Sequence, residues 1–142
     1  MINASEHIEQ DLYLALSTSY LVTNRNGITG SVYRGEMRPD GSLLEDVVVK
    51  FLSGYDEQFQ TGICIVNIYV NDIMVEGYKR KLPNTSRMQF LSELLTSFLE
   101  DNYDEEYGWY VEETPLVLEA EQVGQHFINA RVRYRRFTER NE

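Results

Sequence analysis

Few residues in the sequence are of a type that could carry out catalysis. The two histidines, His7 and His126, are far apart, and neither stands at metal-ligand spacing from the cysteine or from the other histidine. Cys64, the single cysteine, lies in an apolar run, which favours a small buried hydrophobe over a nucleophile. The sequence has no glycine-rich phosphate loop, no G-x-S-x-G motif and no EF-hand loop. We therefore expect no enzyme activity and no cofactor.

Carboxylates are the most concentrated chemical groups. The segment from Glu100 to Glu121 contains nine acidic residues and no basic ones. Adjacent carboxylates on a loop could bind a hard cation such as Ca²⁺, but the alternate spacing and the glycine of a calcium loop are missing. A cleft of buried acids with raised pKa values would instead indicate an enzyme. We favour a solvated acidic tip or a patch that faces a partner.

Basic residues gather at the other end of the sequence. Residues 131–136 contain four arginines, and strand alternation would place Arg131, Arg133 and Arg135 on one face. A net charge of −10 repels nucleic acid, so we expect no specific nucleic-acid binding and favour pairing with acids of this chain or of a neighbouring copy. The predicted interaction surface consists of seven charged residues: Asp101, Asp104, Glu105, Glu106, Arg131, Arg133 and Arg135.

Hydrophobic periodicity predicts the elements that carry these residues. We expect a helix over residues 4–20, then strands over 29–37 and 45–52 that pair as a hairpin around a turn at 38–42. A polar loop over 53–60 would lead to a central strand, 61–71, covered on both faces.

The second half of the chain is predicted to contain another helix and another hairpin. A helix over 85–101 has an apolar stripe, and Ser86 with Gln89 matches a capping box. Strands over 109–119 and 125–138 would form a hairpin. A register that pairs Val117 with Ile128 would place Glu112 opposite Arg133 and bury Val132 rather than Arg133.

These elements predict an α+β fold: an antiparallel or mixed sheet of about five strands with two helices on one face, in the order α-β-β-β-α-β-β. The chain has 142 residues, of which 42% are apolar, so it can form its own core, and we expect a single domain over residues 1–142. The N-terminus lacks the features of a signal peptide, and the longest apolar run, 63–70, is too short to span a bilayer.

The order of elements resembles that of the tail-terminator, or tail-completion, proteins of long-tailed bacteriophages and their prophage relatives. The resemblance extends over the leading helix, the turn at 39–41, the apolar strand 62–70, the helix 86–100 and the closing hairpin that ends at Phe137. It does not extend to the segment 72–84, which contains Lys79, Arg80 and Lys81. The resemblance implies a small protein without catalytic residues that forms a ring, usually hexameric, caps the tail tube and faces the head connector.

Two classes of function follow. The first is a structural protein of a phage or prophage tail, which self-associates and contacts tail or connector proteins. Opposed charged patches suit such head-to-tail association, and a contact of this kind closes into a ring when the rotation permits. The alternative is a small adaptor domain that binds an unrelated protein. On either interpretation we expect a protein that lies in the host cytoplasm or on the virion, with no membrane partner.

Overall fold

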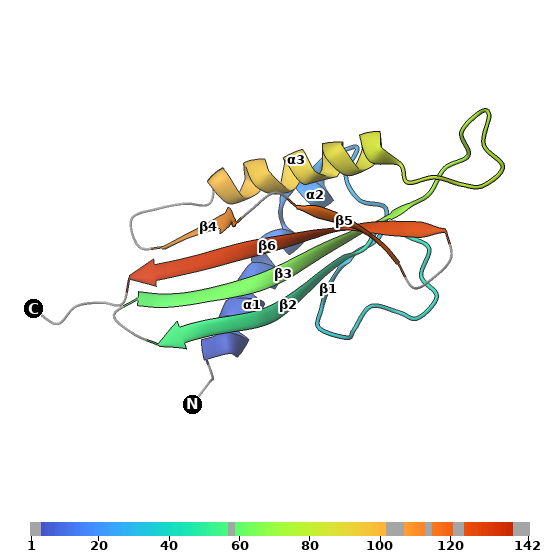
Figure 1. Ribbon diagram of the computed structural model, residues 1–142. Coiled ribbons are helices and arrows are strands. Elements are labelled where there is room, and N and C mark those ends of the chain that lie inside the picture. The colour runs from blue at the N-terminus through green and yellow to red at the C-terminus, as the bar shows by residue number, and fades with distance from the viewer. Residues whose placement is uncertain (1–3, 57–58, 102–106, 113–114, 121–123, 138–142) are drawn as a thin grey trace, which may run out of the picture.

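The computed structural model describes residues 4–56, 59–101, 107–112, 115–120 and 124–137. Within them the chain forms two long helices, a one-turn helix and a six-stranded sheet (Figure 1). In chain order the elements are α1 (Ala4–Ser17), α2 (Tyr20–Thr23), β1 (Val32–Arg34), β2 (Val47–Asp56), β3 (Phe59–Asn71), α3 (Thr85–Asp101), β4 (Tyr107–Val111), β5 (Leu116–Glu119) and β6 (Gln125–Phe137).

The sheet is mixed. Its strands lie in the order β1-β2-β3-β6-β4, and β5 pairs with β6 beyond the end of β4. β1 runs parallel to β2, whereas every other pair is antiparallel. The long pairing of β3 with β6 forms the centre of the sheet. The fold is thus α+β, as the sequence predicts, and β5 is the additional strand.

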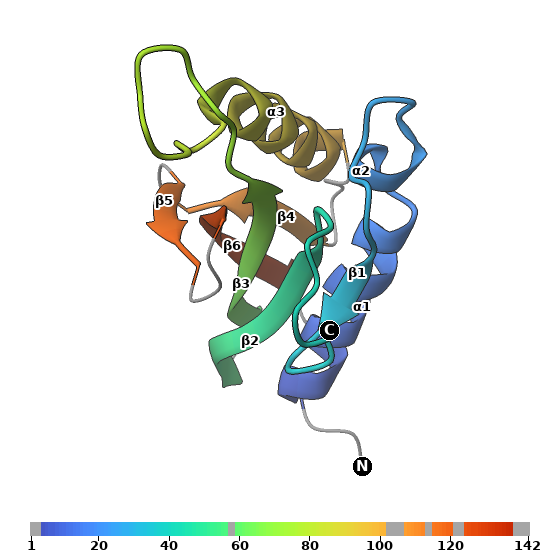
Figure 2. The ribbon, with the colours of Figure 1, turned by 90° about the vertical axis from the view of Figure 1, so that its right-hand side faces the viewer.

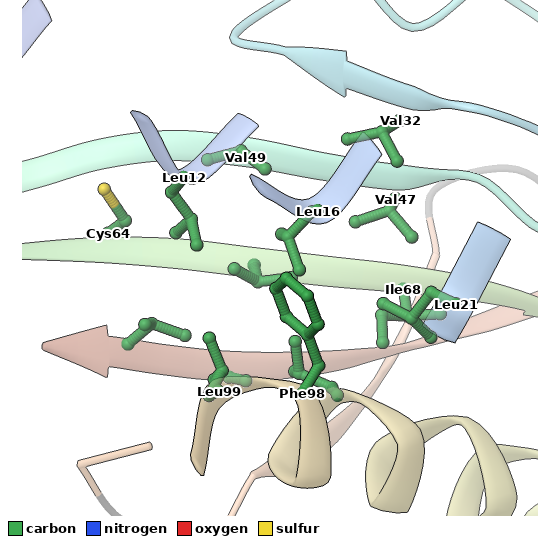
Figure 3. Packing of buried hydrophobic residues seen from close by; sticks show 14 of the residues in the cluster. Leu12, Leu16, Leu21, Val32, Val47, Val49, Cys64, Ile68, Phe98 and Leu99 are labelled. Carbon is green, nitrogen blue, oxygen red and sulfur yellow. The ribbon is translucent and has the colours of Figure 1, made fainter. Parts of the chain in front are cut away.

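Both long helices pack on the same face of the sheet (Figures 1 and 2). Leu12 and Leu16 of α1 meet Val49 and Ile68 of the strands, and α3 closes the other side of the cluster (Figure 3). These side chains are fully buried, and each large aliphatic group removed from water stabilises the fold by about 1.5–3 kcal/mol. We call this side of the sheet the covered face and the other side the open face.

The central strand β3 is buried less evenly than the sequence predicts. Cys64, Val66 and Ile68 point to the covered face and are fully buried. Ile63 and Ile65 point to the open face and are only half-buried. The expectation that both faces are covered was therefore wrong, because α1 and α3 pack on the same side and leave the other without a helix.

The first predicted helix, residues 4–20, is divided in two. α1 ends at Ser17, and α2 begins after Ser19, which is completely buried. The Ser19 hydroxyl donates to the Leu16 carbonyl at 2.7 Å and accepts from the Leu21 amide at 3.2 Å. Ser19 therefore links the end of α1 to the start of α2, a local polar contact that hydrophobic periodicity does not reveal.

The hairpin predicted from strands 29–37 and 45–52 was wrong. The turn forms, with Gly41 at φ 75°, but β1 and β2 run parallel and pair Val32 with Val47. The segment 35–46 is long enough to lead from the end of β1 back to the level at which β1 begins, as the connection between two parallel strands requires. Arg38 holds it there, because its Nε donates to Asp46 Oδ2 at 2.9 Å.

The predicted polar loop 53–60 was also wrong over most of its length. β2 continues to Asp56 and β3 begins at Phe59, so these residues extend an antiparallel hairpin. The pairing changes register between Phe51 and Ser53, which indicates a bulge. Gly62 lies close to α1, since a Cβ there would stand 2.7 Å from Ile8 Cδ1.

The predicted helix 85–101 is confirmed as α3, and its stripe of Met88, Leu91, Leu95, Phe98 and Leu99 is buried. Its cap differs from the prediction. The side chain of Asn84 accepts from the Arg87 amide at 3.2 Å, so Asn84 rather than Ser86 caps the helix.

The predicted register of the closing strands is confirmed, because Val117 pairs with Ile128. Val132 is fully buried, whereas the Arg133 side chain is 27% exposed. The predicted continuous strand 109–119 is instead β4 and β5, and β4 pairs with β6 in a register shifted by two residues. The residue opposite Arg133 is therefore Tyr110 rather than Glu112.

Candidate interaction surface

The acidic part of the predicted surface begins at the end of α3. The Tyr20 hydroxyl donates to Asp101 Oδ2 at 2.5 Å, and this hydrogen bond raises the pKa of Tyr20. The Tyr20 ring also meets Phe98 edge-on, with 5.8 Å between the ring centroids. Asp101 therefore connects α3 to α2. The other predicted acids, Asp104, Glu105 and Glu106, lie outside the described residues.

The basic part follows the open face of β6. Arg131, Arg133 and Arg135 alternate with buried residues and therefore point away from the helices. The guanidinium of Arg133 donates to Glu112 Oε2, with 2.9 Å to Nε. Glu112 reaches this arginine diagonally, since its own amide donates to the Arg131 carbonyl. The structure thus brings together one acid of the 100–121 segment and one arginine of the predicted surface.

Cross-strand pairs continue the open face along β3 and β6. The rings of Tyr69 and Phe127 lie 4.9 Å apart, and Asn129 donates to Asn67 Oδ1 at 2.8 Å. These side chains are half-buried, because neighbouring side chains shield them while no helix covers them. This part of the open face therefore presents aromatic, amide and guanidinium groups in a row.

A buried polar cluster closes the opposite end of the open face. Asp46 is completely buried and binds Arg38, the Ser42 hydroxyl at 2.6 Å and the Ser31 amide at 3.1 Å. Arg38 also donates to Gln125 Oε1 at 3.0 Å, and its guanidinium lies 3.8 Å from the Tyr69 ring centroid. The segment 35–46 therefore covers this end of the face.

A second buried cluster joins α3 to the N-terminal half of the chain. Arg87 makes two hydrogen bonds with Glu45, at 2.7 and 2.8 Å, and these bonds raise its pKa. Its remaining donors meet the carbonyls of Asn26 and Gly27 at 2.7 Å. Among the described residues, no buried side-chain polar atom lacks a partner. Both clusters are therefore satisfied internally and hold the fold together.

A projecting segment, residues 72–84, extends away from the sheet beside the start of α3 (Figures 1 and 2). We call it the arm. Ile73 and Leu82 exchange backbone hydrogen bonds of 2.8 Å, and Gly77 has φ 93°. At the base, Asp72 Oδ1 lies 2.7 Å from His126 Nδ1. The arm is therefore fixed at its base.

The arm exposes both apolar and basic groups. Met74 is 63% exposed and Tyr78 is 56% exposed, and Lys79, Arg80 and Lys81 are exposed next to them. The arm was not predicted from the sequence as a candidate surface. The available signal was an apolar residue pattern interrupted by Gly77 and followed directly by three cations.

An apolar groove of about 230 Å³ lies between α3 and β5. Its lining residues are Thr85, Met88, Gln89, Ser92, Pro115, Val117 and Ile128. Val117 is 50% exposed although it points to the covered face, because α3 does not pack tightly against β5. This groove, too, was not predicted.

The chemistry of Cys64 follows from its burial. Burial raises the pKa of the thiol to about 12, with a smaller contribution from the charge of Glu9. A thiol in this state is a poor nucleophile at neutral pH. His126 is held by Asp72, whose Oδ1 lies 2.7 Å from its Nδ1. The described residues contain no group of three or more potential metal ligands.

Neither a scan against protein-family models nor a search of curated proteins found a match for this chain. Within the described part of the chain, no helix has the length and apolar character needed to cross a membrane.

Proposed function

We propose that this chain is a non-enzymatic structural protein of a phage or prophage tail, which forms a ring that terminates the tail tube and joins the head connector. The observation that carries the proposal is that different parts of the molecule offer different contact surfaces. The arginine row of β6 lies on the open face, and the arm extends from the end of β3. A subunit of a ring needs two unlike surfaces, because each copy contacts its neighbours head to tail.

Charge supports the same assignment. Lys79, Arg80 and Lys81 are exposed on the arm, and Arg131 and Arg135 are exposed on β6. The exposed acids Glu93, Glu100 and Asp101 lie on α3 instead. Separated patches of opposite sign select one orientation of approach between copies. The resemblance of the sequence to the tail-terminator proteins supports the same proposal.

Light scattering and electron microscopy of the purified protein test the ring. We expect rings in concentrated solution, or rings that form when tail tubes are added. To test binding to tail tubes, the fluorescently labelled protein is mixed with tubes purified from a lysate of the phage or prophage that carries the gene. Label at one end of each tube is the expected result. A protein that stays monomeric and leaves the tube ends unlabelled would contradict the proposal.

A second experiment tests the alternative that the protein is an adaptor. Affinity purification of the tagged protein from its native host would recover tail or connector proteins if the proposal holds. Recovery of one unrelated protein in stoichiometric amount, without any tail protein, would favour the adaptor.

A further inference from the structure

Among the described residues, no side chain fills the apolar groove between α3 and β5. Met88 and Ile128 form its floor, and Val117 stands half-exposed at its side. A cavity of about 150 Å³ takes a benzene-sized group, so a groove of about 230 Å³ has room for an aromatic side chain or for one long aliphatic side chain. Leaving such a surface in water forgoes the free energy that its burial would supply.

The arm presents the complementary shape. It carries the exposed side chains of Met74 and Tyr78, which are residue types that serve well as anchors at interfaces. The bridge between Ile73 and Leu82 joins the two sides of the arm, and Asp72 meets His126 at its base, so the arm is already ordered in the monomer. A segment that is already ordered loses less conformational entropy when it docks.

Charges favour the same match. The arm carries three consecutive cations, Lys79, Arg80 and Lys81. None of the residues that line the groove is charged, so the acids next to them decide the charge at its edge. Glu93 is exposed next to the lining residue Ser92, and Glu119 points to the same side of β5 as Val117. The rim of the groove is therefore acidic.

We propose that the arm of one copy docks in the α3–β5 groove of a second copy, with Met74 or Tyr78 in the groove and the three cations against its acidic rim. The proposal rests on the proposed function, because it names the contact through which the copies associate. Arm and groove are different patches, so each copy can donate its arm to one neighbour and receive an arm from another.

Disulfide trapping tests the contact even if the association is weak. One preparation carries Met74→Cys on the arm, and the other carries Gln89→Cys at the exposed side of the groove. Cys64 can remain, because it is fully buried. A matched control replaces Gln89→Cys with Asp40→Cys, which is exposed on the segment 35–46. We expect about tenfold more crosslinked dimer from the first mixture than from the control, the ratio that a preference of about 1.4 kcal/mol produces.

Equal yields from the two mixtures would overturn the proposal. A chain that carries both Met74→Cys and Gln89→Cys and crosslinks only within itself would overturn it as well, since the arm would then occupy its own groove. Raising the salt concentration to about 1 M should reduce the yield from the first mixture, because the Debye length falls to about 3 Å. A yield that does not change with salt would show that the three cations of the arm do not contribute to docking.

Matched variants separate this inference from the ring itself. We expect Met74→Asp and Val117→Asp each to lower the oligomer fraction in light scattering, and their mixture to restore a dimer with one intact contact. If the wild type forms rings and neither variant changes them, the arm contact is wrong while the ring stands. If the wild type stops at a dimer that both variants dissociate, the contact stands and the ring is wrong.

Discussion

The two faces of β3 differ although their residues alternate along one strand. On the covered face, Cys64, Val66 and Ile68 are completely buried beneath the helices. On the open face, Ile63 and Ile65 are half-buried, and none of the helices in the described part of the chain lies over them. Side chains that are adjacent in sequence therefore meet very different surroundings. One side of β3 thus belongs to the core, whereas the other side is available for contacts.

Charged groups follow a related division along the open face. Asp46 is buried at one end, beneath the segment 35–46, and every one of its contacts is internal. Arg133 lies at the other end, where its ion pair with Glu112 is partly exposed. A buried charge is costly to leave without partners, whereas a solvated ion pair contributes little.

The largest expected difference between the faces is in thiol reactivity. Burial raises the pKa of Cys64 from 9.0 to about 12, so the thiolate fraction near pH 8 falls about a thousandfold. We expect a thiol reagent to modify native Cys64 about 50 times more slowly, or slower still, than the cysteine of an Ile65→Cys, Cys64→Ser variant, because the greater nucleophilicity of a thiolate with a raised pKa offsets part of its lower population. Stopped-flow absorbance measures both rates. The rates should become similar in guanidinium, and similar rates in the native state would contradict the difference between the faces.

Removal of a buried charge partner should have the next largest effect. Asp46→Ala leaves the Arg38 side chain, which is only 13% exposed, without its carboxylate partner, and we expect a loss of about 3–5 kcal/mol in the free energy of unfolding. Chemical denaturation measures the loss. Asp40→Ala in the same segment is the control, because Asp40 is exposed and should change stability by less than about 0.5 kcal/mol. Equal effects would show that the segment 35–46 contributes nothing to the fold.

Two isoleucines of β3 allow the same test without charge. Ile68→Ala removes fully buried groups and leaves a cavity, so we expect a cost of about 2–5 kcal/mol. Ile65→Ala removes a half-buried side chain and should cost less than half as much. Urea denaturation of both variants gives the ratio. A ratio near one would mean that the open face is covered in solution, as it would be in an assembly.

A smaller effect is expected at the exposed end of the open face. Arg133→Ala breaks the ion pair with Glu112 and should cost about 0.2–1 kcal/mol. The cost should shrink as salt is added, because the pair is partly solvated. Thermal unfolding at low and high salt measures this dependence. If Arg133→Ala lowered the free energy of unfolding as much as Asp46→Ala, the proposed difference between buried and solvated charges would be wrong.

The smallest effect concerns Glu36 and Lys50. Lys50 Nζ lies 2.6 Å from Glu36 Oε2, and this hydrogen bond lowers the pKa of Glu36. Lys50→Met should return that pKa toward 4.5, which an NMR titration of the carboxyl carbon detects. Any stability from the pair is present above the unfolded pKa and is lost as pH falls through the folded one. An unchanged pKa in the variant would show that the two side chains do not meet in solution.

The sequence predicted the elements that local pattern determines. The stripe of α3 identified the helix, and alternation along β6 identified the buried Val132 and the exposed Arg133. The pairing of Val117 with Ile128 followed from the same alternation. Each of these depends on residues close together in the chain, so periodicity was sufficient.

Long-range polar contacts were not predictable in this way. Glu45 and Arg87 are 42 positions apart, and Arg38 and Gln125 are 87 apart, so neither pair leaves a local signal. Arg38 and Asp46 hold the segment that makes β1 parallel to β2. The turn at Gly41 alone suggested that the two strands form a hairpin. The arm was not predicted from its apolar residues and three cations, because its exposure depends on what does not pack against it.

The pairing of β3 with β6 has a consequence for the order in which the chain folds. Asn67 and Asn129, which hydrogen bond across this pair, are 62 positions apart, whereas β2 and β3 are joined directly. Local pairs close with little loss of chain entropy, and distant pairs form more slowly. The β2–β3 hairpin can therefore form early during synthesis, while its second edge stays unpaired until β6 has emerged. In that interval the apolar edge of β3 is the part of the nascent chain most open to aggregation.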